Sequence, residues 1–179
     1  AIMDNLYTVD DALKLSHHQL RQYHKQFINS GLVNLMGLIG FDKRFVRAEG
    51  MFVWDEEGTR YCDFLGSYGA LSLGHNPPEI FQAIDKVRET PSMLQAVLNP
   101  LAGVLAHNLA KITPGALQRS FFGNSGAEAV EGALKLARIA TGKTKIISCD
   151  GSFHGKTMGA LSVTGRVKYQ QPFYPLMPG

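Results

Sequence analysis

Residues 119 to 138 have the sequence Arg-Ser-Phe-Phe-Gly-Asn-Ser-Gly-Ala-Glu-Ala-Val-Glu-Gly-Ala-Leu-Lys-Leu-Ala-Arg. A short apolar run ends at Phe122, a Gly-Asn turn follows, and apolar residues then recur at helical spacing. Further on, Lys143 to Cys149 contains Ile146 and Ile147, which predicts a buried strand. A strand, a helix and a strand within about thirty residues form a βαβ unit with parallel strands. The chain is therefore predicted to be of the α/β class.

The predicted helix has sequence signals at both ends. Ser125 is a suitable N-cap, because its hydroxyl can accept from a backbone N–H three residues on. Glu128 can reach back to the N–H of Ser125 as a capping box. Glu131 and Lys135 form a favourable i,i+4 pair, and Gly142 stands where a C-cap glycine belongs.

The start of this helix is a candidate anion site. Its first turn leaves backbone N–H groups unpaired at the positive end of the helix dipole, and Gly126 and Ala127 are small enough for an anion to approach closely. The alternative is a plain capped helix that binds nothing, as most helices with such a cap do. The cap and the small residues alone leave both interpretations open.

A second segment is expected beside this helix start. Ligands in parallel sheets bind at the carboxyl ends of the strands, so residues after Phe122 and after Cys149 are expected to converge. The second predicted strand is followed by Asp150-Gly-Ser-Phe-His-Gly-Lys-Thr157. Phe153 would offer an apolar face to a flat heteroaromatic ring, and such stacking adds about 0.5–1.5 kcal/mol beyond area burial.

Composition excludes several classes of function. The chain has 179 residues and a formal net charge of +3, which gives no electrostatic case for nucleic-acid binding. No apolar run approaches the ~20 residues of a membrane span, and no signal-peptide pattern opens the chain, so a cytoplasmic protein is expected. Cys62 and Cys149 lack metal-ligand spacing, so no metal site is expected and both are predicted to be reduced cysteines in or near the core.

The remaining elements predict three parts. Residues 1–44 are expected to form a lead helix and linker, 45–90 a small-domain segment with a β-hairpin, and 91–179 an incomplete large domain. The opening Ala1 and the loop-like end indicate a segment of a longer polypeptide. The predicted elements are a helix over 10–28 ending at Asn29-Ser30-Gly31, a hairpin of 50–54 and 59–64 around the turn 55–58, and helices over 78–89 and 100–111.

Two motifs about 27 residues apart resemble one known family. The stretch 121–138 is similar to the cofactor-phosphate segment of the class III pyridoxal-phosphate aminotransferases, which include the ornithine, acetylornithine, 4-aminobutyrate and putrescine enzymes. The stretch 153–157 is similar to that family's aromatic-His-Gly-basic-Thr motif, and the hairpin with the glycine-rich segment 65–77 also matches. The resemblance implies a fold type I transferase, in which this chain holds the amino-terminal helix and hairpin segments and the start of the mostly parallel large-domain sheet.

The resemblance also implies a cofactor site for pyridoxal 5'-phosphate. Ser125, Gly126 and Ala127 would hold the phosphate, and Phe153 would stack on the pyridine ring. His154 would support the loop rather than transfer protons. The family more often has threonine where this chain has Ala127, so one side-chain hydroxyl contact would be missing while the backbone N–H contacts remain.

Two further residues bear on the substrate. Tyr68 lies in the glycine-rich segment that the family places near the active site at the subunit interface, so it is a candidate for the substrate pocket; the alternative is that it packs in a turn. Lys156 stands where family members acting on α-carboxylates usually have arginine, whose planar fork holds a carboxylate by two hydrogen bonds. The expected substrate is therefore a diamine, an ω-amine or an aliphatic aldehyde, as in the putrescine-type members.

The catalytic lysine of the family has no match in these residues. Transamination requires a Schiff-base lysine, which the resemblance places beyond Gly179. The hypothesis is an aminotransferase that forms homodimers, as the family does; the alternative is a catalytically inert fragment or pseudo-enzyme that serves as a phosphate-binding or assembly module. A Rossmann dehydrogenase is disfavoured, because no G-x-G-x-x-G follows a strand.

Overall fold

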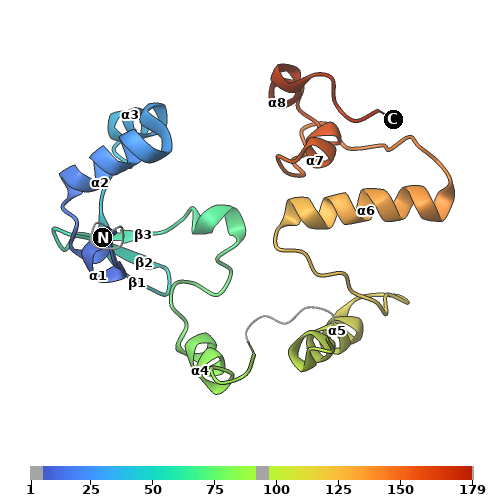
Figure 1. The fold of residues 1–179 in the computed structure, drawn as a ribbon, viewed down its shortest axis with the longest axis horizontal. Coiled ribbons are helices and arrows are strands. Elements are labelled where there is room, and N and C mark those ends of the chain that lie inside the picture. Colours follow the sequence, from blue (N-terminus) through green and yellow to red (C-terminus); the bar gives the residue numbers. More distant parts are fainter. Residues whose placement is uncertain (1–5, 92–96, 179) are drawn as a thin grey trace. The chain divides into compact units, whose positions relative to one another are not determined.

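The computed structural model describes residues 6–91 and 97–178. The chain divides into two compact units, Ala1–Leu94 and Gln95–Gly179, and each is described by itself. The first holds the amino-terminal helices and a small sheet, and the second consists of helices and loops among its described residues (Figure 1). The three-part division of the chain remains a prediction.

The first unit begins with short helices rather than one lead helix. They are α1 (Val9–Lys14), α2 (His17–His24), the π-helix η2 (Lys25–Asn29) and α3 (Ser30–Leu38). The prediction of a single helix over 10–28 was wrong because Ser16 starts a new helix, its side chain accepting from the N–H of Gln19. The predicted stop at Asn29 is confirmed, since η2 ends there and Asn29 has extended backbone angles (φ −161°, ψ 109°). The Asn29 side chain also accepts from the N–H of Leu32, 2.9 Å away, and so caps α3, which follows at once.

The sheet of this unit is antiparallel and has the order β1-β2-β3. Its strands are β1 (Phe45–Glu49), β2 (Phe52–Asp55) and β3 (Arg60–Cys62). The predicted hairpin is confirmed as β2 and β3, with Val53 opposite Tyr61, and β1 is an additional strand. Asp55 orders the turn, since its buried carboxylate accepts from the N–H of Thr59 (2.8 Å) and the hydroxyl of Tyr61 (2.9 Å).

A loop and a helix complete the first unit. The glycine-rich segment forms the 3₁₀-helix η3 (Gly66–Gly69), and α4 (Pro78–Lys86) covers most of the predicted helix 78–89. The Asp63 carboxylate accepts from the N–H groups of Leu65 and Gly66, and its other oxygen lies 2.9 Å from Nε2 of His75. These contacts give His75 a structural position at the start of the loop that leads to α4.

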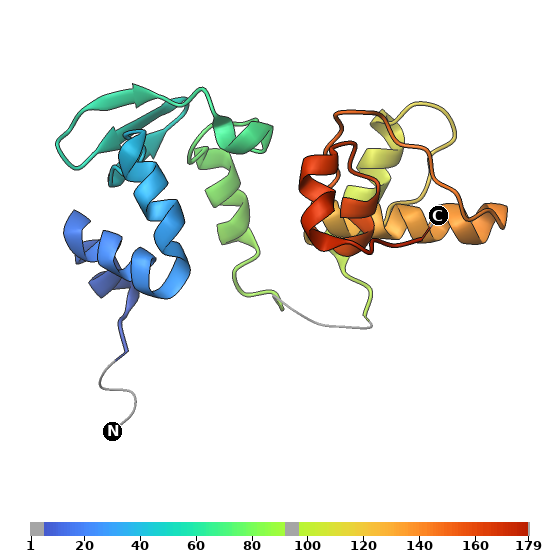
Figure 2. The ribbon, with the colours of Figure 1, turned by 90° about the horizontal axis from the view of Figure 1, so that it is seen from above.

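The second unit is organised around its longest helix, α6 (Gly126–Thr141). The helix α7 (Met158–Ser162) packs against α6, and α8 (Val167–Gln170) packs against α7 (Figure 1, Figure 2). The unit also contains α5 (Pro100–Ile112), close to its predicted bounds, and the 3₁₀-helix η4 (Gln171–Phe173). Among residues 97–178, the buried ones are Gly159, Ala160 and Leu161 of α7 with the neighbouring Thr164, so α7 is the packing centre of this part of the unit.

The predicted parallel strands are absent from the described residues. Neither 120–122 nor 143–149 is a strand, and the sheet that the structure does contain is the antiparallel one of the first unit. A strand is stable only when a neighbour pairs with its sideways-pointing N–H and C=O groups, and these two segments make no such ladder with each other. The fold is thus mixed α/β with a small antiparallel sheet.

The burial predicted for this region was also wrong. Ile147 is 98% exposed, and Cys62 and Cys149 are both exposed free cysteines rather than core residues. The segment of Ile147 and Cys149 has no strand partners and no layer to cover it, so its side chains stay accessible, whereas Cys62 is exposed although it belongs to β3 of the small sheet. No helix among the residues described here is long and apolar enough to cross a membrane.

Candidate cofactor site

The candidate site begins at the N-terminus of α6. Ser125 has extended backbone angles (φ −150°, ψ 161°), and its hydroxyl accepts from the N–H of Glu128 at 3.2 Å, so the predicted cap is confirmed. The predicted capping box is shifted by one residue, because the Glu128 carboxylate accepts from the N–H of Asn124 and not from that of Ser125. At the other end, Gly142 is in the left-handed region at φ +67°, as a C-cap glycine should be.

The first turn of α6 is open to a ligand. An added Cβ at Gly126 would meet no atom within 4 Å, so the space next to this backbone is free. The N–H groups of the first helical residues have no acceptor within the helix and lie at the positive end of its dipole. This donor set suits a phosphate group.

The loop 150–157 folds directly onto this turn. Gly155 has φ +130°, and a Cβ built there would lie 2.7 Å from Cβ of Ala127 and 3.2 Å from Cβ of Ala160. Real Cβ atoms do not approach so closely, so only glycine lets the loop reach Ala127. The predicted convergence of the residues after Phe122 and after Cys149 is therefore found, although the two strands that motivated it are not.

Phe153 lies on this loop with its ring accessible. Its side chain is 60% exposed, and its ring packs edge-on against Tyr169 with centroids 6.4 Å apart and planes at 86°. One aromatic contact thus holds the ring while most of its surface stays free to stack on a flat ligand. His154 is half-buried, and its backbone N–H donates to Oγ1 of Thr164 at 3.2 Å.

A hydrogen-bonded frame behind the loop was missed from the sequence. Thr164 is 1% exposed, and its hydroxyl donates to the carbonyl of Ala160 at 3.0 Å while accepting from His154. The Gly165 N–H donates to the backbone oxygen and the hydroxyl of Ser152. The pattern Ser-Val-Thr-Gly165 after an apolar run was the available signal, since buried hydroxyls need partners.

Glu131 was assigned to the wrong partner. It is in none of the ion pairs of the described residues, and the pairing with Lys135 is replaced by hydrogen bonds to its Oε1 from the Thr157 hydroxyl (2.6 Å) and from two backbone N–H groups. The hydrogen bond from Thr157 holds the pKa of Glu131 below its ordinary value; burial opposes this, and the N–H groups of Ala160 and Gly159 and the charge of Lys135 reinforce it.

The two substrate-pocket candidates differ in where they lie. Lys156 is exposed on the loop next to Gly155 and forms no ion pair among the described residues. Tyr68 belongs to the other unit, where its side chain is 92% exposed and its backbone, like that of Ser67, has positive φ (+57° and +52°). Such strained backbone concentrates at functional sites. The structure brings Ser125, Gly126, Ala127, Phe153, His154 and Lys156 to one region of the second unit.

The donors and acceptors of this region favour an organic phosphate over a metal. Among residues 6–91 and 97–178, no group of three or more His, Cys, Asp or Glu side chains could hold a metal ion. The site combines free backbone N–H groups, an exposed aromatic ring and one lysine, which are the parts that a planar phosphorylated ligand requires.

Comparison with known proteins identifies the class. The family model for class-III aminotransferases matches residues 41–179, so the chain belongs to this family. This confirms the family predicted from the two motifs.

Individual relatives are more specific. The chain is 42% identical over 161 residues to the aminotransferase PigE of Serratia sp. (strain ATCC 39006). This alignment covers 88% of this chain and 19% of that protein. The chain is also 46% identical over 129 residues to the putrescine aminotransferase of Pectobacterium atrosepticum. That alignment covers 70% of this chain and 28% of that protein. The matched part of the chain thus spans 19% and 28% of the length of these two relatives.

Solved structures of the family share the fold. The taurine:2-oxoglutarate aminotransferase from Bifidobacterium kashiwanohense, determined in complex with PLP and glutamate, superimposes with a TM-score of 0.75 at 30% identity. The match covers 88% of this chain and 35% of that one. Fold type I aminotransferases are therefore structural neighbours of this chain.

Proposed function

We propose that the protein is a pyridoxal-phosphate-dependent aminotransferase whose substrate carries its reacting amine or carbonyl on a carbon without a carboxylate. The observation that carries the proposal is the close seating of Gly155 on Ala127, which joins the helix start that can hold a phosphate to the loop that carries Phe153. The family membership and the PLP-bound structural neighbour support it.

Each residue of the site has a role under this proposal. The backbone N–H groups of Gly126 and Ala127 bind the phosphate, and the Ser125 hydroxyl keeps the helix start in place by capping Glu128. Phe153, whose ring is largely exposed, would offer an apolar face to the pyridine ring and exclude water from it. His154 supports the loop through its N–H bond to Thr164. The cofactor would supply an electron sink for carbanion chemistry, and a Schiff-base lysine outside these residues would complete the site.

The substrate class follows from Lys156 within the proposal. A lysine is a single point charge, so it cannot form the two parallel hydrogen bonds with which an arginine holds an α-carboxylate. The 46% identity to a putrescine aminotransferase supports a diamine, an ω-amine or an aliphatic aldehyde as substrate. Tyr68 is proposed to line the substrate pocket of a homodimer, supported by its exposure and its strained backbone.

The test begins with the full-length polypeptide and pyridoxal phosphate. Borohydride reduction followed by peptide mapping is expected to label one lysine outside residues 1–179. Diffuse or absent labelling would instead favour an inert phosphate-binding or assembly module.

The labelled enzyme is then assayed with two amino donors. We expect putrescine to give a higher kcat/KM than acetylornithine, and Lys156→Arg to raise the relative kcat/KM for acetylornithine about tenfold, since a charged bidentate pair contributes on the order of 1–3 kcal/mol. An equal or better rate of the unmodified enzyme with acetylornithine would contradict the proposed substrate class.

A further inference from the structure

Glu131 lies one helical turn after Ala127 on the same face of α6. This face is the one on which the loop 150–157 and α7 are seated, since Gly155 touches Ala127 and Thr157 bonds to Glu131. The first turn of α6 at Gly126 and Ala127, which is proposed to bind the phosphate and is called the phosphate seat below, and the Glu131 carboxylate therefore lie one turn apart on one packing surface.

The Glu131 carboxylate takes the place of an N-cap for α7. Thr157, the residue before α7, makes no side-chain cap of its own. Its hydroxyl donates to Oε1 of Glu131 at 2.6 Å, and the N–H groups of Gly159 and Ala160 donate to the same oxygen at 3.0 and 3.2 Å. The anion thus satisfies donors at the start of α7 that have no acceptor within the helix.

Close packing leaves this arrangement little freedom. Gly159 is buried, and a Cβ built there would collide with Oε2 of Glu131, so a side chain at this position would force the carboxylate out of its place. Ala160 is fully buried, and its Cβ lies 3.2 Å from the position of an added Cβ on Gly155. A shift of α7 along α6 would therefore move Gly155 and, with it, Phe153.

We propose that Glu131 is a positioning residue, which fixes α7 on α6 and thereby keeps the loop that carries Phe153 in its place beside the first turn of α6. This inference rests on the proposed function, because it assigns Glu131 to the cofactor site. The residue acts through Thr157 and the α7 backbone, and it does not touch the cofactor itself.

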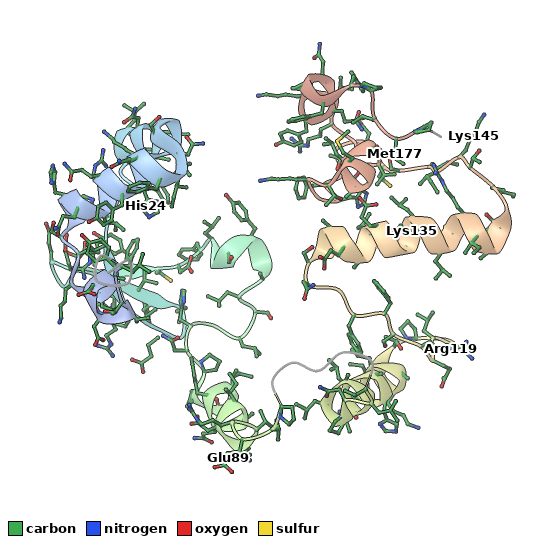
Figure 3. The ribbon with its side chains drawn as sticks, in the orientation of Figure 1. His24, Glu89, Arg119, Lys135, Lys145 and Met177 are labelled. Atoms are coloured by element: carbon green, nitrogen blue, oxygen red, sulfur yellow. The ribbon has the colours of Figure 1, made fainter. Side chains whose placement is uncertain are left out.

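The surroundings of Glu131 allow a clean substitution. Beside it lies a cavity of about 150 Å³ between α6, α7 and the C-terminal segment, and its lining includes Lys135 and Met177 (Figure 3). Glutamine has nearly the size of glutamate and retains one carbonyl oxygen, so Glu131→Gln removes the charge from these hydrogen bonds without creating an overpacked site. Hydrogen bonds to a charged acceptor are roughly twice as strong as neutral ones.

The experiment measures binding to the full-length protein by titration calorimetry. The probe is 4'-deoxypyridoxine 5'-phosphate, which has the ring and the phosphate but no aldehyde, so its binding needs no lysine. Inorganic phosphate, measured by competition, reports on the seat alone. We expect Glu131→Gln to raise the dissociation constant of the ring-bearing probe about tenfold and that of inorganic phosphate less than twofold, because the phosphate seat is formed by the first turn of α6.

The matched control is Glu57→Gln, the same chemical change at an exposed position of the other unit. It is expected to leave both dissociation constants unchanged. Thr157→Val provides a second variant that removes the shortest hydrogen bond to Glu131, and Thr157→Ser should restore binding because it keeps the hydroxyl. In the double variant of Glu131 and Thr157, the losses should be less than additive, since both residues act through one contact.

The outcomes separate the two proposals. If the unmodified protein does not bind the ring-bearing probe, the proposed function fails. If it binds but Glu131→Gln and Thr157→Val bind equally well, the positioning role is refuted while the proposed function stands. Equal losses of affinity for the probe and for inorganic phosphate would also refute the positioning role, because a general loss of folded protein affects both ligands alike. Additive losses of affinity in the double variant would refute it too, because the two residues would then not act through one contact.

Discussion

Replacing Gly155 with alanine tests whether the loop after Cys149 is seated on α6 at the distance described. Gly155 has φ +130°, a region that residues with a side chain rarely adopt. The added methyl group would stand 2.7 Å from Cβ of Ala127, 3.1 Å from its Cα and 3.2 Å from Cβ of Ala160. Both the backbone and the packing therefore oppose the substitution.

The expected cost follows from these two effects. A residue held in such a region of backbone angles costs about 1–3 kcal/mol. Forcing a methyl group into a packed site costs about 1–3 kcal/mol more. The sum is about 2–6 kcal/mol, and the least costly way to relieve it is for the loop to lift away from Ala127, since the loop is more exposed than α7.

Hydrogen exchange of the full-length protein measures this opening. The N–H groups of His154 and Gly165 are protected by bonds to Thr164 and Ser152. A loss of about 2 kcal/mol in opening free energy accelerates their exchange about 30-fold, and larger losses accelerate it further. The control is Gly103→Ala, because Gly103 lies within α5 and an added Cβ meets no atom within 4 Å. This control should stabilise α5 by about 0.5–1 kcal/mol.

Unchanged exchange at His154 and Gly165 in the Gly155→Ala protein would refute this reasoning. It would mean that the loop does not approach α6 closely enough for a methyl group to matter. Faster exchange across both units, including the sheet, would point to global unfolding instead, and a direct contact between Gly155 and Ala127 would then not be needed to explain it.

Two further predictions concern single positions. Gly142→Ala should lower the stability of α6 by about 1 kcal/mol, because Gly142 has φ +67°, and Gly142→Asn should cost less; equal unfolding midpoints for all three proteins would contradict this. Asp55 has a lowered pKa: burial opposes ionisation, but hydrogen bonds from Tyr61, Thr59 and Glu57 and the charge of Lys43 outweigh it. Its stabilising contribution is therefore present above the ordinary value of 3.8 and is lost as the pH falls through the lower pKa of the folded protein. The difference in unfolding midpoint between the unmodified protein and Asp55→Asn should be constant from about pH 5 to 7 and shrink as the pH falls below 3.8. A difference that begins to shrink well above pH 5 would contradict the lowered pKa.

Elements with local signals were predictable from the sequence. The helix α6 begins directly after Ser125 and ends directly before Gly142, because each of these two residues caps the helix through contacts with residues only a few positions away. The hairpin of β2 and β3 was predictable for the same reason, since Asp55 and Gly58 build its turn locally. The single lead helix was a wrong prediction, because Ser16 is a cap that a partial apolar stripe does not reveal, whereas the predicted end at Asn29 is found.

Contacts between distant residues were not predictable in this way. The i,i+4 rule assigned Glu131 to Lys135, but an exposed ion pair of this kind contributes only about 0.3–0.5 kcal/mol. A hydroxyl and two N–H groups from residues 26 to 29 positions away give the carboxylate a better set of partners. The strands failed for a related reason, because a run such as Ile146-Ile147 specifies a strand only where another strand pairs with it.

The approach of the residues after Cys149 to those after Phe122 was nevertheless predicted from the sequence, although the sheet invoked to explain it is not formed by these residues. Its two halves meet through backbone: the open first turn of α6 at Gly126, and the passage of Gly155 over Ala127. Sites of this kind require small residues at fixed places. Small residues can be recognised in a sequence without knowing which distant segment packs against them. Under the proposed function, alanine at 127 would be compatible with the site although the resemblance leads one to expect threonine, since the backbone N–H that would bind the phosphate is present with either residue. Gly155 cannot be replaced in the same way, because any side chain there would collide with Ala127 and push the loop away from α6.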